Sequence, residues 1–141
     1  MSTLFDPAKP AHADALDHLE RDVVGWLTTV TPDGMPQTSI ICFIWDGETI
    51  LTYSEPGKPK TRNVAANPRV AFNLNSDDHG DHWVSIEGTA VVDESAPPSD
   101  RHDPWMAKHA GPYRHWGMDP HETAETWSVA LRVTPTRVRV W

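Results

Sequence analysis

Residues 25–54 read GWLTTVTPDGMPQTSIICFIWDGETILTYS, and this stretch decides the fold. It contains two turn sequences that are typical of β-hairpins, Pro32-Asp33-Gly34 and Asp46-Gly47. The segments around these turns are rich in apolar, β-branched and aromatic residues, which favours strands over helices. The stretch therefore predicts three consecutive antiparallel strands, at residues 25–31, 35–45 and 48–54.

The rest of the chain extends this pattern on both sides. Residues 11–22 carry apolar side chains at helical spacing, which predicts an amphipathic helix, and a shorter helix is expected at residues 61–66. Further strand patterns follow at residues 69–75, 82–93 and 127–141. Six strands with small helices between them predict a mainly β protein, a six-stranded antiparallel sheet closed into a small barrel.

Residues 94–125 show no clear period and are rich in Pro, His and Trp. We expect an irregular connection there, with one helix near residues 104–109. Connections of this length are uncommon unless they have a function. The segment around Trp105, Tyr113 and Trp116 is therefore expected to be either a lid or wall of a pocket, or only a dimer contact.

Two details of the last strands bear on a site. In residues 82–93 the apolar side chains share one face, and Trp83 falls on the other, so we expect Trp83 at an interface or in a pocket wall. In residues 127–141 the alternation slips by one position after Pro135. Such a slip predicts a β-bulge at a sheet edge.

Length and composition exclude several classes of protein. Residues 1–141 suffice for one domain, and a formal net charge of −8 argues against nucleic-acid binding. No apolar run is long enough to span a membrane, and the N-terminus lacks the apolar core of a signal peptide, so we expect a soluble, cytoplasmic protein. The single cysteine, Cys42, excludes an internal disulfide, and its place in an apolar strand favours an inert thiol.

Four cations and no acid lie between residues 56 and 69 of this acidic chain: Lys58, Lys60, Arg62 and Arg69. The first three fall where a loop becomes a helix. Backbone N–H groups at the start of a helix favour an anion, and nearby cations add to this effect, so the segment indicates a phosphate site. Hydroxyls for such a site are available from Tyr53, Ser54 and Thr61. The alternative is a solvated cationic loop.

Histidine-rich segments are the remaining candidates for chemistry. His79 and His82 lie among Asp77, Asp78 and Asp81, but this loop has no helical or strand spacing that would preorganise ligands, so we assign no metal site. No Gly-rich dinucleotide loop and no serine in a nucleophile-elbow context is present.

The order of several short motifs resembles a known family. A hairpin through Asp33-Gly34-x-Pro36 is followed by Trp45-Asp46-Gly47, Tyr53-Ser54, Lys60-x-Arg62-Asn63 and Asn67-Pro68-Arg69-Val70, and the chain closes with Pro135-Thr136-Arg137-Val138-Arg139-Val140-Trp141. Together these motifs resemble the pyridoxamine 5′-phosphate oxidase-like split β-barrels, which bind FMN or the deazaflavin coenzyme F420. The match covers residues 15–93 and 127–141.

The resemblance implies a homodimer of FMN-binding split barrels with the cofactor at the subunit interface. Lys60 would meet the cofactor phosphate, the strand from Ser39 to Ile44 would run along the ring system, and Trp83 would come from the partner subunit. Trp141 falls where the oxidases place a tryptophan beside the cofactor. The implied cofactor-binding residues are Ser39, Ile40, Ile41, Cys42, Tyr53, Ser54, Lys58, Lys60, Thr61, Arg62, Asn63, Trp83 and Trp141. No catalytic residue is assigned.

Two departures from the oxidases narrow the function. Pro59 stands where the oxidases have an arginine, and the sequence ends at Trp141, where they continue into a basic tail that handles pyridoxal phosphate. Pyridoxamine phosphate oxidation is therefore not expected. The sequence is more similar to the small F420-dependent reductases, which implies hydride transfer from F420H2 to an activated double bond of a small organic molecule.

Three alternatives stay open. The first is an FMN-dependent flavin reductase or oxidase with the same fold. The second is a non-enzymatic F420- or flavin-binding protein, and the third is a split-barrel haem binder. F420 differs from FMN in its anionic glutamate tail, for which Arg62, Arg137 and Arg139 are the candidate partners.

Overall fold

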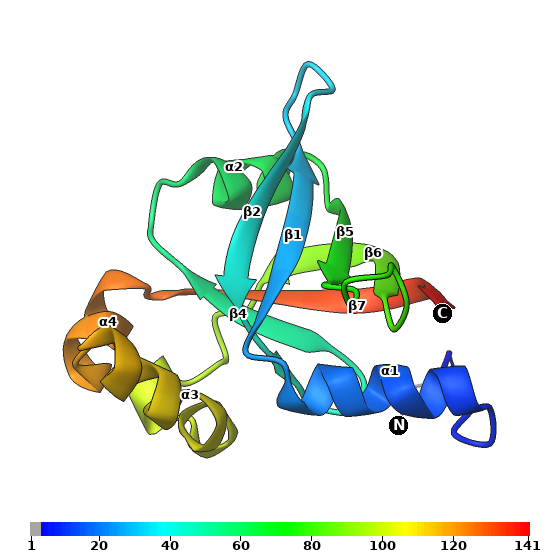
Figure 1. Ribbon diagram of the computed structural model, residues 1–141. Coiled ribbons are helices and arrows are strands. Elements are labelled where there is room, and N and C mark those ends of the chain that lie inside the picture. Colours follow the sequence, from blue (N-terminus) through cyan, green and yellow to red (C-terminus); the bar gives the residue numbers. More distant parts are fainter. Residues whose placement is uncertain (1–3) are drawn as a thin grey trace.

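The computed structural model describes residues 4–141 (Figure 1). In chain order the elements are α1 (Pro10–Arg21), β1 (Val24–Val30), β2 (Pro36–Cys42), β3 (Ile44–Trp45), β4 (Ile50–Ser54), α2 (Pro59–Ala66), β5 (Arg69–Leu74), β6 (Val84–Val92), the 3-10 helix η1 (Ser99–Arg101), α3 (Asp103–Trp116), α4 (Pro120–Thr126) and β7 (Val129–Val140). The seven strands form one antiparallel sheet in the order β2-β1-β5-β6-β7-β4-β3. None of the helices described is long and apolar enough to cross a membrane.

The sheet is curled because its two edge strands are neighbours in the sequence. β2 forms one edge and β3 the other, and only Phe43 separates them. The chain thus passes directly from one edge of the sheet to the opposite edge, so the two edges must lie together. This confirms the predicted mainly β, antiparallel barrel, with seven strands in place of six.

The extra strand arises because residues 35–45 do not form one strand. β2 pairs with β1, whereas β3 pairs with β4 at the other end of the sheet, and Phe43 between them is fully buried. The Phe43 carbonyl accepts a hydrogen bond from His109 Nε2 of α3 at 2.9 Å, which satisfies a backbone group that has left the sheet.

The expected irregular connection at residues 94–125 is wrong, since η1, α3 and α4 fill most of it. Pro104 and Pro120 lie in the first turns of α3 and α4, where a missing N–H costs nothing. The side chain of His102 caps α3, and that of Asp119 caps α4. Two prolines of this segment therefore mark the starts of helices, and a third, Pro112, lies inside α3, which also includes the helix expected near residues 104–109.

α1 and α3 cover different parts of the curled sheet (Figure 1). The buried side chains of α1, Ala15 and Leu19, join the main core inside the curl, where Phe43 and Phe72 meet edge to face at 4.9 Å between ring centroids. α3 packs through Trp105 against a second cluster, which comprises Ile44, Leu51, Tyr53, Trp105 and Ala130. The helix predicted at residues 11–22 is confirmed.

The predicted bulge at Pro135 is also confirmed. Gly88 of β6 lies opposite Pro135, but Glu87 lies opposite Arg137, so one residue of β7 has no partner in the register. A side chain on Gly88 would place its Cβ 2.4 Å from the Thr134 carbonyl oxygen, which explains the glycine. β4 pairs with β7 only as far as Val133, so the C-terminal half of β7 is an edge.

The buried His109 makes the stability of the fold depend on pH. Burial lowers the pKa of His109 to about 4, from an ordinary 6.5. As the pH falls below 6.5, His109 becomes protonated in the unfolded chain but stays neutral in the folded chain until the pH approaches 4. The stabilisation present above pH 6.5 is therefore lost progressively as the pH falls towards 4, and it amounts to about 3 kcal/mol.

We predict that His109→Gln removes this part of the pH dependence. Glutamine keeps an N–H for the Phe43 carbonyl but does not titrate. Between pH 7 and pH 4 the free energy of unfolding of the parent protein should fall by about 3 kcal/mol more than that of the variant, measured by urea denaturation. Parallel pH profiles for the two proteins would contradict the assignment.

Candidate functional site

Two pockets meet at Lys60, each with a volume of about 200 Å³. The first, which we call the polar pocket, is lined by Thr29, Gln37, Thr38, Ser39, Lys58, Pro59 and Lys60. The second, the aromatic pocket, is lined by Ile40, Ile41, Cys42, Tyr53, Lys60, Ser99, Trp105, Tyr113, Trp116, Met118, Thr123 and Trp127. They form one site with a cationic end and a flat, apolar end.

Lys60 is a half-buried cation without a counterion. Burial is the main reason that its pKa lies below the ordinary value, and the neighbouring charge of Lys58 adds to the effect. Lys58 is paired with Glu55 at 3.3 Å, whereas no ion pair within residues 4–141 engages Lys60. An anion in the polar pocket would remove this electrostatic penalty, so the pocket suits a phosphate.

The start of α2 lies at the same pocket, because Pro59 and Lys60 line it, while the N–H groups of Thr61 and Arg62 donate to the Lys58 carbonyl. Pro59 begins the helix with a preset φ, and neither a side-chain cap nor an acidic residue occupies its first turn. The Thr61 hydroxyl is buried there with no partner among the described residues. An unpartnered buried hydroxyl and an uncapped helix start both favour an anionic ligand.

Apart from Lys60, where the two pockets meet, the titratable side chains that line the aromatic pocket are uncharged at neutral pH. Burial raises the pKa of Tyr53 to about 12 and also raises the pKa values of Cys42 and Tyr113. The Tyr53 hydroxyl donates to the Pro97 carbonyl at 2.6 Å, and the Tyr113 hydroxyl accepts from the indole N–H of Trp105 at 2.8 Å. The side chains are thus fixed as walls, and they suit a flat conjugated ring.

β2 forms the wall that both pockets share. Its residues from Ser39 to Cys42 line the pockets in turn, and the strand pairs with β1 only. One row of its backbone N–H and C=O groups therefore has no strand partner. Ile40 projects from this strand with 54% of its surface exposed. A heterocycle along β2 would find both apolar contact and backbone hydrogen bonds.

Comparisons with known proteins identify the family. A family model described as pyridoxamine 5′-phosphate oxidase matches residues 11–141. The chain belongs to this family. A curated relative, general stress protein 26 of Bacillus subtilis strain 168, is 34% identical over 88 residues. The match covers 61% of this chain and only 62% of the relative's length.

Two solved structures of similar fold carry informative names. A candidate pyridoxamine 5′-phosphate oxidase from Listeria innocua is 28% identical, with a TM-score of 0.69 over 91% of this chain and 95% of that one. A protein named F420 reductase is also 28% identical, with a TM-score of 0.65 over 87% of this chain and 94% of that one. The sequence-based resemblance to the oxidase family is confirmed.

The structure brings together seven of the thirteen site residues implied by the family resemblance. The pockets are lined by Ser39, Ile40, Ile41, Cys42, Tyr53, Lys58 and Lys60. Trp105, Tyr113 and Trp116, expected as a pocket wall or a dimer contact, line the aromatic pocket. Thr61 lies in the first turn of α2 and lines neither pocket. Phe43 and Ile44 are buried and do not line the pockets, so the part of the expected strand from Ser39 to Ile44 that reaches them ends at Cys42.

Three other implied residues line neither pocket and instead contact the loop before α2 or the β1–β2 hairpin. The Ser54 hydroxyl is buried and donates to the Glu55 carbonyl at 3.4 Å, and the Arg62 guanidinium donates to the Gly57 carbonyl. Asn63 is buried, and its amide N–H groups donate to Thr29 at 3.0 Å and to Gln37 at 2.9 Å. Asn63 therefore ties α2 to the β1–β2 hairpin.

Trp83 and Trp141 line neither pocket of their own chain. The backbone N–H of Trp141 donates to the Trp83 carbonyl at 3.2 Å, and its indole N–H donates to Asp81 at 3.1 Å. Their expected contact with cofactor therefore requires a second chain and remains a prediction. Of the candidate partners for a glutamate tail, Arg137 pairs with Glu87 at 3.9 Å, Arg139 donates to the Ser85 hydroxyl and Arg62 donates to the Gly57 carbonyl.

Sequence analysis missed several lining residues. Thr29 and Gln37 lie opposite one another in the β1–β2 hairpin. The register that follows from the predicted turn could therefore have placed them beside Ser39. Met118, Thr123 and Trp127 reach the aromatic pocket from the region around α4, whose helical structure was not expected.

We predict that Asn63→Ala destabilises the protein through the lost contacts between α2 and the hairpin. The substitution leaves the buried Thr29 hydroxyl without its donor, so the free energy of unfolding should fall by about 2–3 kcal/mol in urea denaturation. The control is Asn67→Ala, which removes one exposed hydrogen bond to the Arg69 N–H and should cost less than about 1 kcal/mol. Equal losses in both variants would refute the buried role of Asn63.

Proposed function

We propose that this protein is an F420-dependent reductase that transfers a hydride from F420H2 to an activated double bond of a small organic molecule. The observation that carries the proposal is that a polar pocket lined by Lys58 and Lys60 and a pocket lined by aromatic side chains meet at Lys60. A cofactor with a phosphate at one end and a tricyclic ring at the other would place its phosphate in the polar pocket and its ring in the aromatic pocket. The 28% identity to a protein named F420 reductase supports a deazaflavin, and the equal identity to a candidate pyridoxamine 5′-phosphate oxidase keeps FMN as the alternative that the titration below tests.

The residues present fit such a cofactor. Lys60, the start of α2 and the unpartnered Thr61 hydroxyl would hold the phosphate. The free edge of β2 would hold the ring, and Trp105, Trp116 and Trp127 would shield it from water. When bound, the reduced deazaflavin supplies the hydride. The protein's contribution is to position the ring and leave space beside it for the acceptor.

Water is the proposed source of the proton that completes the reduction. The proton of the Tyr53 hydroxyl is committed to the Pro97 carbonyl, and its pKa of about 12 makes it a weak acid. The raised pKa values of Cys42 and Tyr113 make these groups weak acids too. A pocket whose hydroxyl and thiol groups are all weak acids suits a reaction whose reactive group belongs to the coenzyme. The residues that line the two pockets include no histidine, which disfavours a haem site with histidine ligation.

The proposal includes a homodimer with the site at its interface. Large apolar side chains are exposed on the described surface, among them Ile40 beside the site, Met35 on the hairpin and Trp141 near the end of β7. A partner chain would cover such side chains and could bring its Trp83 to the cofactor. Sedimentation equilibrium should give twice the mass of the chain, and a monomer at micromolar concentration would exclude this arrangement.

The first test is a fluorescence titration with F420 and FMN side by side. Three of the seven tryptophans line the aromatic pocket, so a bound ring should quench the emission strongly. Saturable quenching that is tighter with F420 supports the proposal, and tighter quenching with FMN assigns the protein to the flavin-dependent members. If neither F420 nor FMN binds, both the F420-dependent and the flavin-dependent assignment are wrong. Binding without oxidation of F420H2 by any activated alkene would indicate a non-enzymatic carrier.

We predict that Lys60→Ala weakens the binding of F420 by about 1.5–3 kcal/mol, or roughly 10- to 150-fold in Kd, because it removes one charge-assisted contact to the phosphate. The matched control is Arg69→Ala, a cation from the same stretch that lines neither pocket, and its Kd should be unchanged. Equal affinities of the folded Lys60→Ala variant and the parent protein would remove Lys60 from the site.

A further inference from the structure

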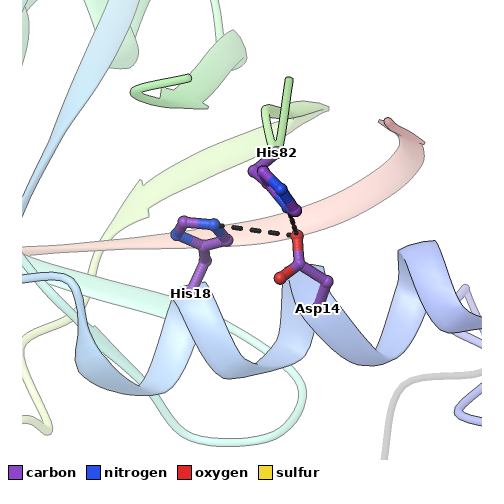
Figure 2. A group of neighbouring side chains, drawn as sticks. All are labelled: Asp14, His18 and His82. Carbon is purple, nitrogen blue, oxygen red and sulfur yellow. Dashed lines mark hydrogen bonds and ion pairs between the residues drawn. The ribbon is translucent and has the colours of Figure 1, made fainter. Parts of the chain in front are cut away.

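A second cluster of ligating side chains lies away from the two pockets, between α1 and the loop that precedes β6 (Figure 2). Asp14 and His18 are one turn apart on α1, and His82 reaches them from the loop. Asp14 Oδ2 lies 2.9 Å from His82 Nδ1 and 3.7 Å from His18 Nε2. All three ligating atoms lie within 4.8 Å of one another.

From this arrangement we propose that Asp14, His18 and His82 form a binding site for a divalent transition-metal ion such as Zn²⁺. At usual Zn–N and Zn–O bond lengths, tetrahedral coordination separates the donor atoms by about 3.4 Å. The two measured distances to Asp14 lie on either side of this value, so small side-chain rotations would complete the site. Two imidazoles and one carboxylate leave a fourth position for water.

A second carboxylate orients His18 for metal binding. Asp22 Oδ2 accepts a hydrogen bond from His18 Nδ1 at 3.0 Å. With the proton on Nδ1, the lone pair of His18 Nε2 is free to face Asp14 and His82. Histidines that ligate metals commonly donate their other ring N–H to a carboxylate in this way, which fixes the tautomer. Asp22 is therefore a positioning residue that does not itself touch the metal.

The donor set selects the class of metal. Imidazole nitrogen suits Zn²⁺, Co²⁺, Ni²⁺ and Cu²⁺, whereas Mg²⁺ and Ca²⁺ prefer oxygen ligands. Access is open, because 57% of the His82 side chain is exposed. The guanidinium of Arg21 lies 3.4 Å from His18 Nε2 and is the one positive side chain seen to contact this nitrogen among the described residues. Arg21 is exposed and also pairs with Asp17, so a metal ion would displace it at little cost.

The metal would cross-link two segments that are distant in the sequence, α1 and the loop that precedes β6. His82 directly precedes Trp83, so an ion shared with α1 would fix the loop that leads into β6. Without an ion, the contact is the 2.9 Å pair of Asp14 Oδ2 with His82 Nδ1. The site and its test are independent of the proposed reductase function, because neither pocket includes these residues.

The test is a calorimetric titration of the whole protein with Zn²⁺ near pH 8, where imidazole is ordinarily neutral. We expect one ion per chain and, with Co²⁺, visible absorption bands of a four-coordinate site. Free Zn²⁺ at a hundred times its Kd should raise the Tm by about 5–10 °C. Absence of saturable binding would leave only the ion pair and overturn the proposal.

Four variants locate the site. His82→Asn removes a ligand at an exposed residue whose φ of 61° asparagine tolerates, and His18→Gln removes the other imidazole. Each should weaken Zn²⁺ binding at least tenfold, and Asp22→Asn should weaken it about 10- to 100-fold through the lost orientation of His18. The control is His79→Ala in the same loop, which should leave the affinity unchanged. Equal affinities for His82→Asn and the parent protein would contradict the proposal.

Discussion

Phe43 joins the two edges of the sheet, and its backbone must be satisfied where the chain leaves one edge and enters the other. Three hydrogen bonds surround this point: the Phe43 N–H reaches the Val23 carbonyl, the Phe43 carbonyl accepts from His109, and the Cys42 carbonyl accepts from the Thr52 hydroxyl at 2.7 Å. The bond to His109 also anchors α3. The closure of the sheet and the placement of the wall that carries Trp105 therefore depend on the same few backbone groups.

Two kinds of residue build the cationic end of the site: those that face a ligand and those that hold α2 in place. Lys60 and the start of α2 provide a positive potential that no acidic side chain of the described residues neutralises by an ion pair with Lys60. Such a site is unusual in a chain whose net charge is −8. Asn63 lies one turn further along α2. Its amide donates hydrogen bonds to Thr29 and Gln37 of the hairpin, which hold the helix against β1 and β2. The cationic end of the site is thus open to a ligand while the helix that carries it is fixed from the buried side.

Sequence patterns predicted the elements that carry local signals. The hairpin turns, the short helix expected at residues 61–66 and the slip at Pro135 each depend on residues next to one another, although the helix begins two residues earlier, at Pro59. The break at Phe43 could not be predicted, because it lies in an apolar run without glycine or proline and depends on the pairing of each half with a different strand. The approach of His82 to Asp14 spans 68 positions and likewise has no local signal.

Closure of the sheet across Phe43 has a consequence for the order of folding. The pairing of β4 with β7 joins Ile50 to Val133, and that of β1 with β5 joins Trp26 to Asn73. Such non-local contacts close long loops, and proteins that depend on them fold slowly. The aromatic pocket takes its walls from β2, β4, α3 and the region of α4. It is therefore complete only after the long-range pairings have formed, and a ligand that binds there recognises only chains that have finished folding.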